Sequence, residues 1–512
     1  MLKSIKINGL TVVILLTTML FTSCKKEQAK EEYMGVNNPV TTANSVTFKA
    51  VPMPKKLISG LAFPTDSILI NKWISNPKYD NVKAGNFENN PDVINHGWDI
   101  WHALTAYTNE SYDNQKLRRF ETWYTPDDLK KALTDQLVNK SKVSLKSMKR
   151  NRGKLKTPSQ FHIGKNINTS TGDIVSFVKY DPSSANHIFD NKLFFKSKLN
   201  AISKSGATFP EITDFPTSGV TLKPIFDPLS EADLVKEKCA DCYKIAVWPG
   251  EQNNPERKFG EDDWNTFVYV TLTGKTDNEK LIYSVNEFIH FKADEAISKS
   301  RDIKVGDFLI LRAMHVTTRE IKRWTWQTFW WSPNPNSPFK PSSETTASYK
   351  PDQLDHASKH YAMAIAYSMV KPAQPYYNGS GKGANSLYAY NPYLEASFGP
   401  YQVIKDDIAI GGTFSTADQY IQAYGIDQKV GTKLNQFGMQ TNCMSCHGQA
   451  RYIPGITTTD SSSHLYITDQ YFDLKAPYFK GAVKLDFTWS IQGNLMDDKE
   501  LVSSHDESAA LK

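Results

Sequence analysis

Hydrophobic residues follow helical spacing in the first part of the chain. Residues 60–135 are expected to be mainly helical, with Trp98, Trp101 and His102 on one face of a buried helix. Thr-Pro-Asp-Asp-Leu at residues 125–129 is typical of a helix start, because a capping hydroxyl precedes a proline in the first turn.

A strand pattern replaces the helical one between residues 240 and 335. β-Branched and aromatic residues fill Thr266–Thr273, a glycine-containing turn follows, and Leu281–Val285 completes a predicted hairpin. A longer strand is predicted over Phe308–Val316, paired with one over Arg323–Trp331.

The second of these longer strands has bulky residues on both faces. Trp324, Trp326 and Trp330 share one face, and Phe329 and Trp331 share the other. We therefore expect this strand to be buried on both sides.

The segment Pro351–Val370 is predicted to be a helix that carries His356 and His360. Two imidazoles four residues apart can share a metal ion, but no third ligand is evident, and a polar helix face is the simpler interpretation. Further helices are expected at about 416–424 and 430–439, after a long irregular connection.

The N-terminus has the pattern of an export signal. A basic head precedes the apolar run Leu10–Phe21, which is too short to span a bilayer of ~30 Å. Small residues directly before Cys24 resemble a bacterial lipobox, which implies that Cys24 is lipidated and begins the mature chain. Cleavage nearby, as in an ordinary secreted protein, is the alternative.

Composition indicates a folded, mildly basic protein. Of 512 residues 40% are hydrophobic, so large cores can form and a disordered chain is excluded. The net charge of +6 falls to +4 without Lys3 and Lys6 of the predicted signal (6 − 2), which specifies no partner. Residues 140–165 hold nine basic residues and no acidic one, which predicts a mobile solvated loop or, alternatively, a docking patch.

The most specific motif is Cys-x-x-Cys-His at residues 443–447, the attachment signature of a c-type haem. Cys443 and Cys446 can form thioethers with the porphyrin vinyl groups, and His447 can bind the iron as proximal ligand. A disulfide or zinc pair beside a histidine is the alternative. We expect Pro454 to pack nearby, since a proline carbonyl often accepts the Nδ1 proton of such a histidine.

A second Cys-x-x-Cys, formed by Cys239 and Cys242, has no following histidine and is not a haem site. In an oxidising compartment a local disulfide is expected, with a redox-active dithiol as the alternative.

The sixth iron ligand decides the class of chemistry. Met496, at the end of a predicted helix over Leu485–Met496, is a possible distal ligand, and His315 is the alternative. An open sixth position would instead allow ligand binding.

Several separated segments carry a family resemblance. Trp98–Leu104, Phe120–Trp123, Met314–Val316, Trp324–Phe329 and Asn442–His447 resemble large exported bacterial monohaem cytochrome c proteins of the lipoprotein type, which are largely uncharacterised. The resemblance implies one covalent haem c with its iron, and electron transfer with no agreed substrate.

These observations predict an α+β fold, in which a mixed helical and antiparallel β body is followed by a mainly α-helical, cytochrome c-like C-terminal haem region. The predicted segments are a lipoprotein signal peptide (1–23), a flexible tether (24–59), an N-terminal mixed α/β body (60–239), a β-rich region (240–340), a helix with a long loop (341–415) and a haem domain (416–512).

The predicted function is that of a membrane-anchored electron carrier in the cell envelope. Its expected partners are redox proteins and, through Cys24, the lipid membrane; no nucleic acid is expected. The outer membrane facing the periplasm is the favoured location, with the cell surface as the alternative. The alternative function is a haem-dependent oxidoreductase whose aromatic-rich body binds a small-molecule substrate; no catalytic residues can be named.

Overall fold

The computed structural model describes residues that all lie within the unit Ala43–Lys512, which we call the body. The described residues are 47–80, 89–150, 152, 175–176, 178–251, 259–298, 303–373, 385–396, 408–409, 412–413, 442–455, 474–475 and 479–510. The predicted signal peptide and Cys24 lie outside them. Among the helices in this part of the chain, none is long and apolar enough to cross a membrane.

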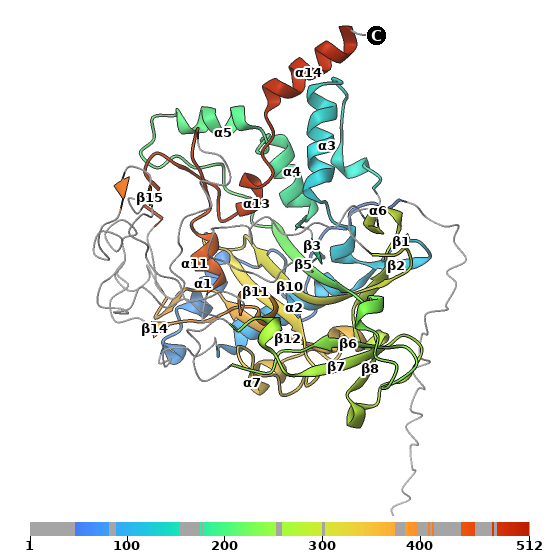
Figure 1. Cartoon of the computed structure of the whole chain (residues 1–512). Helices are drawn as coiled ribbons and strands as arrows, with labels where there is room; N and C mark the ends of the chain where they lie inside the picture. Colours follow the sequence, from blue (N-terminus) through green and yellow to red (C-terminus); the bar gives the residue numbers. More distant parts are fainter. Residues whose placement is uncertain are drawn as a thin grey trace, which may run out of the picture. The chain divides into compact units, whose positions relative to one another are not determined.

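A seven-stranded sheet lies at the centre of the body (Figure 1). Its strands are joined only by antiparallel pairings, so the structure has the mixed helices and antiparallel sheets of the predicted α+β class. The main strand order is β12 (Tyr361–Ala366), β11 (Thr325–Trp331), β10 (Phe308–Thr318), β5 (Val220–Pro228) and β3 (Val175–Ser176), while β4 (Lys179–Tyr180) also pairs with β5 and β9 (His290–Lys292) with β10.

The sheet separates two hydrophobic cores. Trp326 and Trp330 of β11 belong to one core, whereas Phe329 and Trp331 belong to the other, and every residue of β11 is buried. The predicted two-sided burial of this strand is therefore confirmed. We call the core that contains Trp326 the first core and the core that contains Phe329 the second core.

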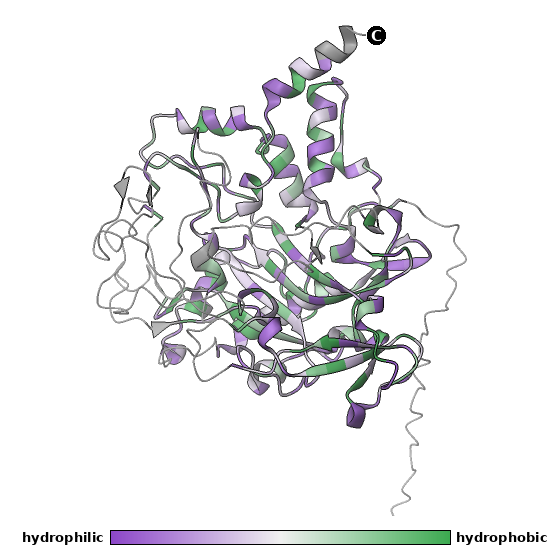
Figure 2. Ribbon diagram, viewed as in Figure 1, coloured by the Kyte–Doolittle hydropathy of each residue, from purple (hydrophilic) through white to green (hydrophobic). Residues whose placement is uncertain are grey.

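Amphipathic helices cover both faces. α2 (Pro91–Thr105) packs on the second core, where Trp101 stacks on Phe329 with ring centroids 4.3 Å apart. α3 (Pro126–Leu137), which begins at the predicted Thr125 capping box, presents its apolar residues to the first core, and Figure 2 shows hydrophobic and hydrophilic residues interleaved along it. α4 (Pro182–Asp190) and α5 (Lys196–Ser203) also pack on the first core.

Shorter elements complete the body. They are α1 (Ser67–Ile74), the hairpin β1 (Tyr107–Tyr112) and β2 (Gln115–Arg118), the small sheet β6 (Cys242–Ala246), β7 (Phe267–Thr271) and β8 (Ile282–Ser284), α6 (Glu295–Ser298), α7 (Glu344–Ala347), α8 (His356–Lys359), β13 (Val370–Lys371), β14 (Asn385–Ser386), α9 (Pro392–Glu395), β15 (Ile408–Ala409), β16 (Gly412–Thr413), α11 (Cys443–His447), β17 (Arg451–Tyr452), β18 (Val483–Lys484), α13 (Trp489–Gln492) and α14 (Asp498–Ala510).

The predicted hairpin over residues 266–285 is wrong. β7 and β8 do pair, but in parallel, with Tyr269 opposite Ile282. After β7 the chain first turns back along the strand. A 3₁₀ turn that ends at Leu281, in the left-handed conformation (φ 56°), then reverses it again, so that β8 starts beside β7 and runs in the same direction.

The helix predicted over Pro351–Val370 is also wrong. Only α8 is helical there, and β12 follows it directly as a strand paired with β11. β12 alternates small and large residues: its three alanines face the first core, and Tyr361, Met363 and Ile365 face the second.

Two further predictions are corrected at the ends of the body. The tether does not extend to residue 59, because Phe48, Met53 and Leu57 are buried. Nor is Leu485–Met496 one helix: it contains only the short α13 and then an extended segment.

Two arginines of the predicted basic segment are buried, and its residues 151 and 153–165 lie outside the described residues. Arg150 and Arg152 are buried, and each pairs with an acidic residue of the body, at 3.1 and 3.3 Å respectively. These two cations therefore hold residues 150 and 152 against the body.

Candidate haem site around His447

The helix that carries the Cys-x-x-Cys-His motif is anchored at its start by Asn442. The Asn442 side chain accepts a hydrogen bond from the Met444 amide (3.0 Å) and donates one to the Leu387 carbonyl (2.8 Å). Met444 is fully buried in the first core. The motif is therefore built onto the central body.

His447 is held in one tautomer. Its Nδ1 lies 3.0 Å from the Phe487 carbonyl oxygen. Because a carbonyl only accepts, Nδ1 must carry the proton, which leaves Nε2 as the unprotonated nitrogen. The acceptor is thus the carbonyl of Phe487 and not that of Pro454, to which the sequence had pointed.

The imidazole is neutral at physiological pH. Burial lowers the pKa of His447; the hydrogen bond to Phe487 opposes this shift, nearby His315 and Lys223 add to it, and the net pKa is about 4. Trp326 lies against the ring, with centroids 4.6 Å apart. A neutral imidazole with fixed orientation and a bare Nε2 is the form that binds metals.

The structure describes the side chain of only one of the two motif cysteines, Cys443. Cys443 is not part of a disulfide, and its Sγ donates to the Ala389 carbonyl at 3.2 Å. Residues four apart share a helix face, so α11 places Cys443 and His447 on one side. The backbone of Cys446 belongs to α11, but its side chain lies outside the described residues.

A polar cluster lies on the face of the central sheet that carries Trp326, the residue packed against His447. His315 on β10 is directly opposite Lys223 on β5 and Thr328 on β11. His315 Nε2 lies 3.0 Å from Glu395 Oε1, and both side chains are largely buried. No pattern in the sequence pointed to Lys223 or Glu395, because only the sheet register and α9 bring them to His315.

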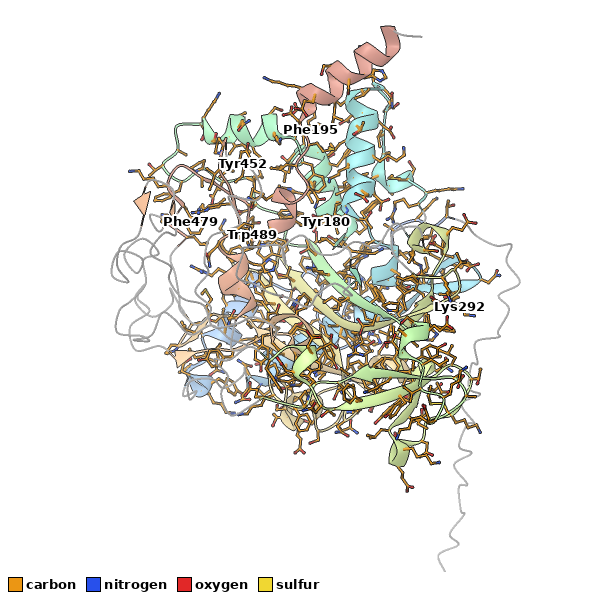
Figure 3. All side chains as sticks on the ribbon, in the orientation of Figure 1. Tyr180, Phe195, Lys292, Tyr452, Phe479 and Trp489 are labelled. Atoms are coloured by element: carbon orange, nitrogen blue, oxygen red, sulfur yellow. A yellow bond between two sulfur atoms is a disulfide. The ribbon has the colours of Figure 1, made fainter. Side chains whose placement is uncertain are left out.

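Met496 lies in a different setting. Its amide donates to the Phe194 carbonyl at 2.7 Å, and its carbonyl accepts from Lys196 at the start of α5. Phe195, labelled in Figure 3, marks this end of the body. Within the described residues, Met496 packs on this segment and the first core. The electrostatic neighbours of His447 are His315 and Lys223.

The residues that follow the motif join the first core. Tyr452, Phe479 and Trp489, all labelled in Figure 3, pack in or against the cluster that contains Met444. Tyr452 also donates to Asn200 on α5 at 2.8 Å. The segment after the motif is therefore packed on the same core as α11 and is tied to α5.

A small open pocket adjoins the motif. Gly448, Ala450 and Phe487 line it, together with Lys322 and Asp214, which pair at 2.6 Å. Its volume of about 20 Å³ is that of a site for a single water molecule. The donor set of neutral imidazole and thiol on one helix face fits a covalently attached haem.

The other Cys-x-x-Cys forms a disulfide. The sulfur atoms of Cys239 and Cys242 are bonded, and the bridge closes the turn that leads into β6. The carboxylate of Asp241, inside this turn, accepts from the amides of Leu272 and Thr273.

Comparison of the chain with models of known protein families, with curated proteins and with solved structures finds no match. The class of protein has to be inferred from the site.

Proposed function

We propose that this protein is a monohaem c-type cytochrome that carries electrons in the cell envelope, akin to the large exported cytochrome c proteins that its sequence resembles. The observation that carries the proposal is His447, a neutral imidazole whose Nδ1 proton is fixed by the Phe487 carbonyl. This is the state of a proximal histidine, and it occurs in a Cys-x-x-Cys-His motif.

Each residue has a defined role in this proposal. Cys443 and Cys446 hold the porphyrin covalently, and His447 Nε2 binds the iron. When bound, the haem supplies a reversible one-electron couple. Phe487 keeps the imidazole from rotating, and Trp326 packs against it to limit water access. We further propose that residues 416–512 include a helical haem-binding region, of which α11, α13 and α14 are described.

Haem staining of a denaturing gel tests the attachment. The chain carries its own matched control, because it has two Cys-x-x-Cys pairs. Cys443→Ser with Cys446→Ser should abolish the stained band, whereas Cys239→Ser with Cys242→Ser should retain it. A stained band of full intensity in the first variant would defeat the proposal.

His315 is the better-placed candidate for the sixth position. It lies on the sheet face that meets His447, whereas Met496 pairs with the start of α5. His315→Ala should therefore convert a low-spin spectrum to a high-spin one, and Met496→Leu should leave it unchanged. The opposite result would reassign the ligand to Met496.

The second candidate function is a haem-dependent oxidoreductase. The observation that favours it is the His315–Glu395 pair, because an imidazole and a carboxylate 3.0 Å apart can transfer a proton to a bound molecule. Carbon monoxide separates the two functions. A reduced spectrum that ignores carbon monoxide supports the carrier, and a shifted Soret band supports an open position and the enzyme.

We propose that lipid attached to Cys24 anchors the protein at a membrane of the cell envelope. A membrane-anchored form should incorporate labelled fatty acid and sediment with membranes, and Cys24→Ser should do neither. Redox proteins of the envelope are the proposed partners, with the outer membrane facing the periplasm as the favoured site.

A further inference from the structure

A second group of ligand-type side chains lies elsewhere in the body. Glu287, His356 and His360 bring one carboxylate oxygen and two imidazole nitrogens within 4.8 Å of one another. Glu287 Oε2 lies 2.5 Å from His356 Nε2 and 2.6 Å from His360 Nε2. The sequence showed the two histidines but not the third ligand, which comes from a segment about 70 residues earlier.

Glu287 is fixed in place before any ligand is considered. It ends the 3₁₀ turn Val285–Glu287 after β8 and is 4% exposed. Its backbone carbonyl accepts from the Trp331 indole at 3.0 Å, and its Oε1 accepts from the Thr276 hydroxyl at 2.6 Å. These contacts leave Oε2 directed at the two imidazoles.

The histidines are presented by α8. His356 is the first residue of this helix and His360 caps its end, so they lie one turn apart. The His360 ring is parallel to the Trp331 indole, with an interplanar angle of 7°. The His356 side chain is 59% exposed, whereas that of His360 is 15% exposed.

Both imidazoles converge on the same carboxylate oxygen. The Nε2 atoms of His356 and His360 each lie within 2.6 Å of Glu287 Oε2, and the three ligand-type atoms all lie within 4.8 Å of one another. One oxygen and two nitrogens that converge in this way can coordinate a shared ion.

We propose that Glu287 Oε2, His356 Nε2 and His360 Nε2 bind a divalent transition metal ion, with Zn²⁺ preferred and solvent at the remaining position. Two imidazoles and one carboxylate form the ligand set of zinc sites that keep an open position. Thr276 orients the carboxylate from behind, as partners of metal ligands do. The proposal is independent of the haem.

Binding requires only a small local movement. Bonds of about 2.0–2.1 Å in a tetrahedron separate ligand atoms by about 3.3 Å, so the imidazoles must move outward by less than about 1 Å. The exposed His356, at the start of a short helix, can make most of this movement. The exposed side also leaves a path for water or a substrate oxygen to reach the ion.

The ion would join two parts of the body. Glu287 directly follows the small sheet β6–β7–β8, and His360 directly precedes β12 of the central sheet. Metal binding should therefore raise the melting temperature, because only the folded chain brings these ligands together.

The test is zinc binding to the full-length, haem-loaded chain after chelator treatment, by competition with a chromogenic zinc chelator. Zinc is measured because haem iron does not contribute to it. Wild type should bind one Zn²⁺ per chain, and Glu287→Gln and His356→Ala should each remove this binding. Thr276→Val should weaken affinity about 10- to 100-fold.

Glu279→Gln and His505→Ala are the matched controls, because both residues are exposed and lie outside the cluster. They should bind zinc as wild type does. Circular dichroism and the haem spectrum show whether each variant is folded, and exposed His356 keeps the test valid if Glu287→Gln fails to fold. Absence of stoichiometric zinc in wild type, or equal binding in folded His356→Ala, would overturn the proposal. Binding of Fe²⁺ in preference to Zn²⁺ would overturn the choice of metal.

Discussion

The neutral state of His447 predicts a specific loss of stability in acid. A histidine with a pKa of about 4 in the folded chain and about 6.5 when unfolded takes up its proton preferentially in the unfolded state. Stability linked to this group is complete above pH ~6.5, falls as the pH decreases, and is fully lost below pH ~4.

The magnitude follows from the shift. A difference of about 2.5 pKa units corresponds to about 3.4 kcal/mol below pH ~4, and the same two pKa values give about 2 kcal/mol at pH 5. Because the ring is only partly buried, these values are upper bounds.

The assay is urea denaturation of the haem-free Cys443→Ser/Cys446→Ser chain at pH 8 and pH 5. The same chain with His447→Gln, whose amide can still donate to Phe487, provides the comparison. The parent should lose up to about 2 kcal/mol more than the glutamine variant between the two pH values. His505→Gln, at an exposed position, controls for the loss of any histidine. Equal losses in the parent and the His447→Gln variant would refute the reasoning.

Three further predictions concern the body. Trp331→Ala should lower the free energy of unfolding by about 3–5 kcal/mol in urea, because the indole is fully buried and stacks on Phe288 at 4.2 Å. Thr125→Ala should cost about 1 kcal/mol in the same assay, because the Thr125 hydroxyl caps α3; Thr125→Ser should restore most of it. Reduction of the Cys239–Cys242 disulfide should cost no more than about 2 kcal/mol, measured as a lower melting temperature, because the loop it closes is very short.

The sequence predicts those elements that depend only on residues close together along the chain. The burial of β11 on both faces can be predicted because bulky aromatic residues occupy both faces of the strand. The start of α3 can be predicted because the Thr125 hydroxyl, followed by a proline, is typical of a helix cap. β12 was missed although Tyr-Ala-Met-Ala-Ile-Ala alternates large and small residues, since a wholly apolar run fits a buried helix equally well. Only the pairing with β11 decides between them.

Site geometry was harder to predict because it depends on distant segments. The motif identified His447, but its hydrogen-bond acceptor lies 40 residues later, at Phe487. Glu287 had no signal at all, since an acidic residue after a strand is common. The ligand-type residues could be named from the sequence, whereas the residues that orient them could not.

The position of α11 gives the large body a structural role at the candidate site. The sequence suggested a small haem domain attached to a larger body, in which case the body would be an accessory. In the structure, Met444, Phe479 and Leu485 share the first core with residues of β11 and β12, and Trp326 of β11 lies against the His447 ring. Because the sheet forms one wall of the site and the chain after the motif supplies the Phe487 carbonyl, neither part can hold His447 alone. The β-body therefore provides the apolar surface that desolvates the imidazole and lowers its pKa.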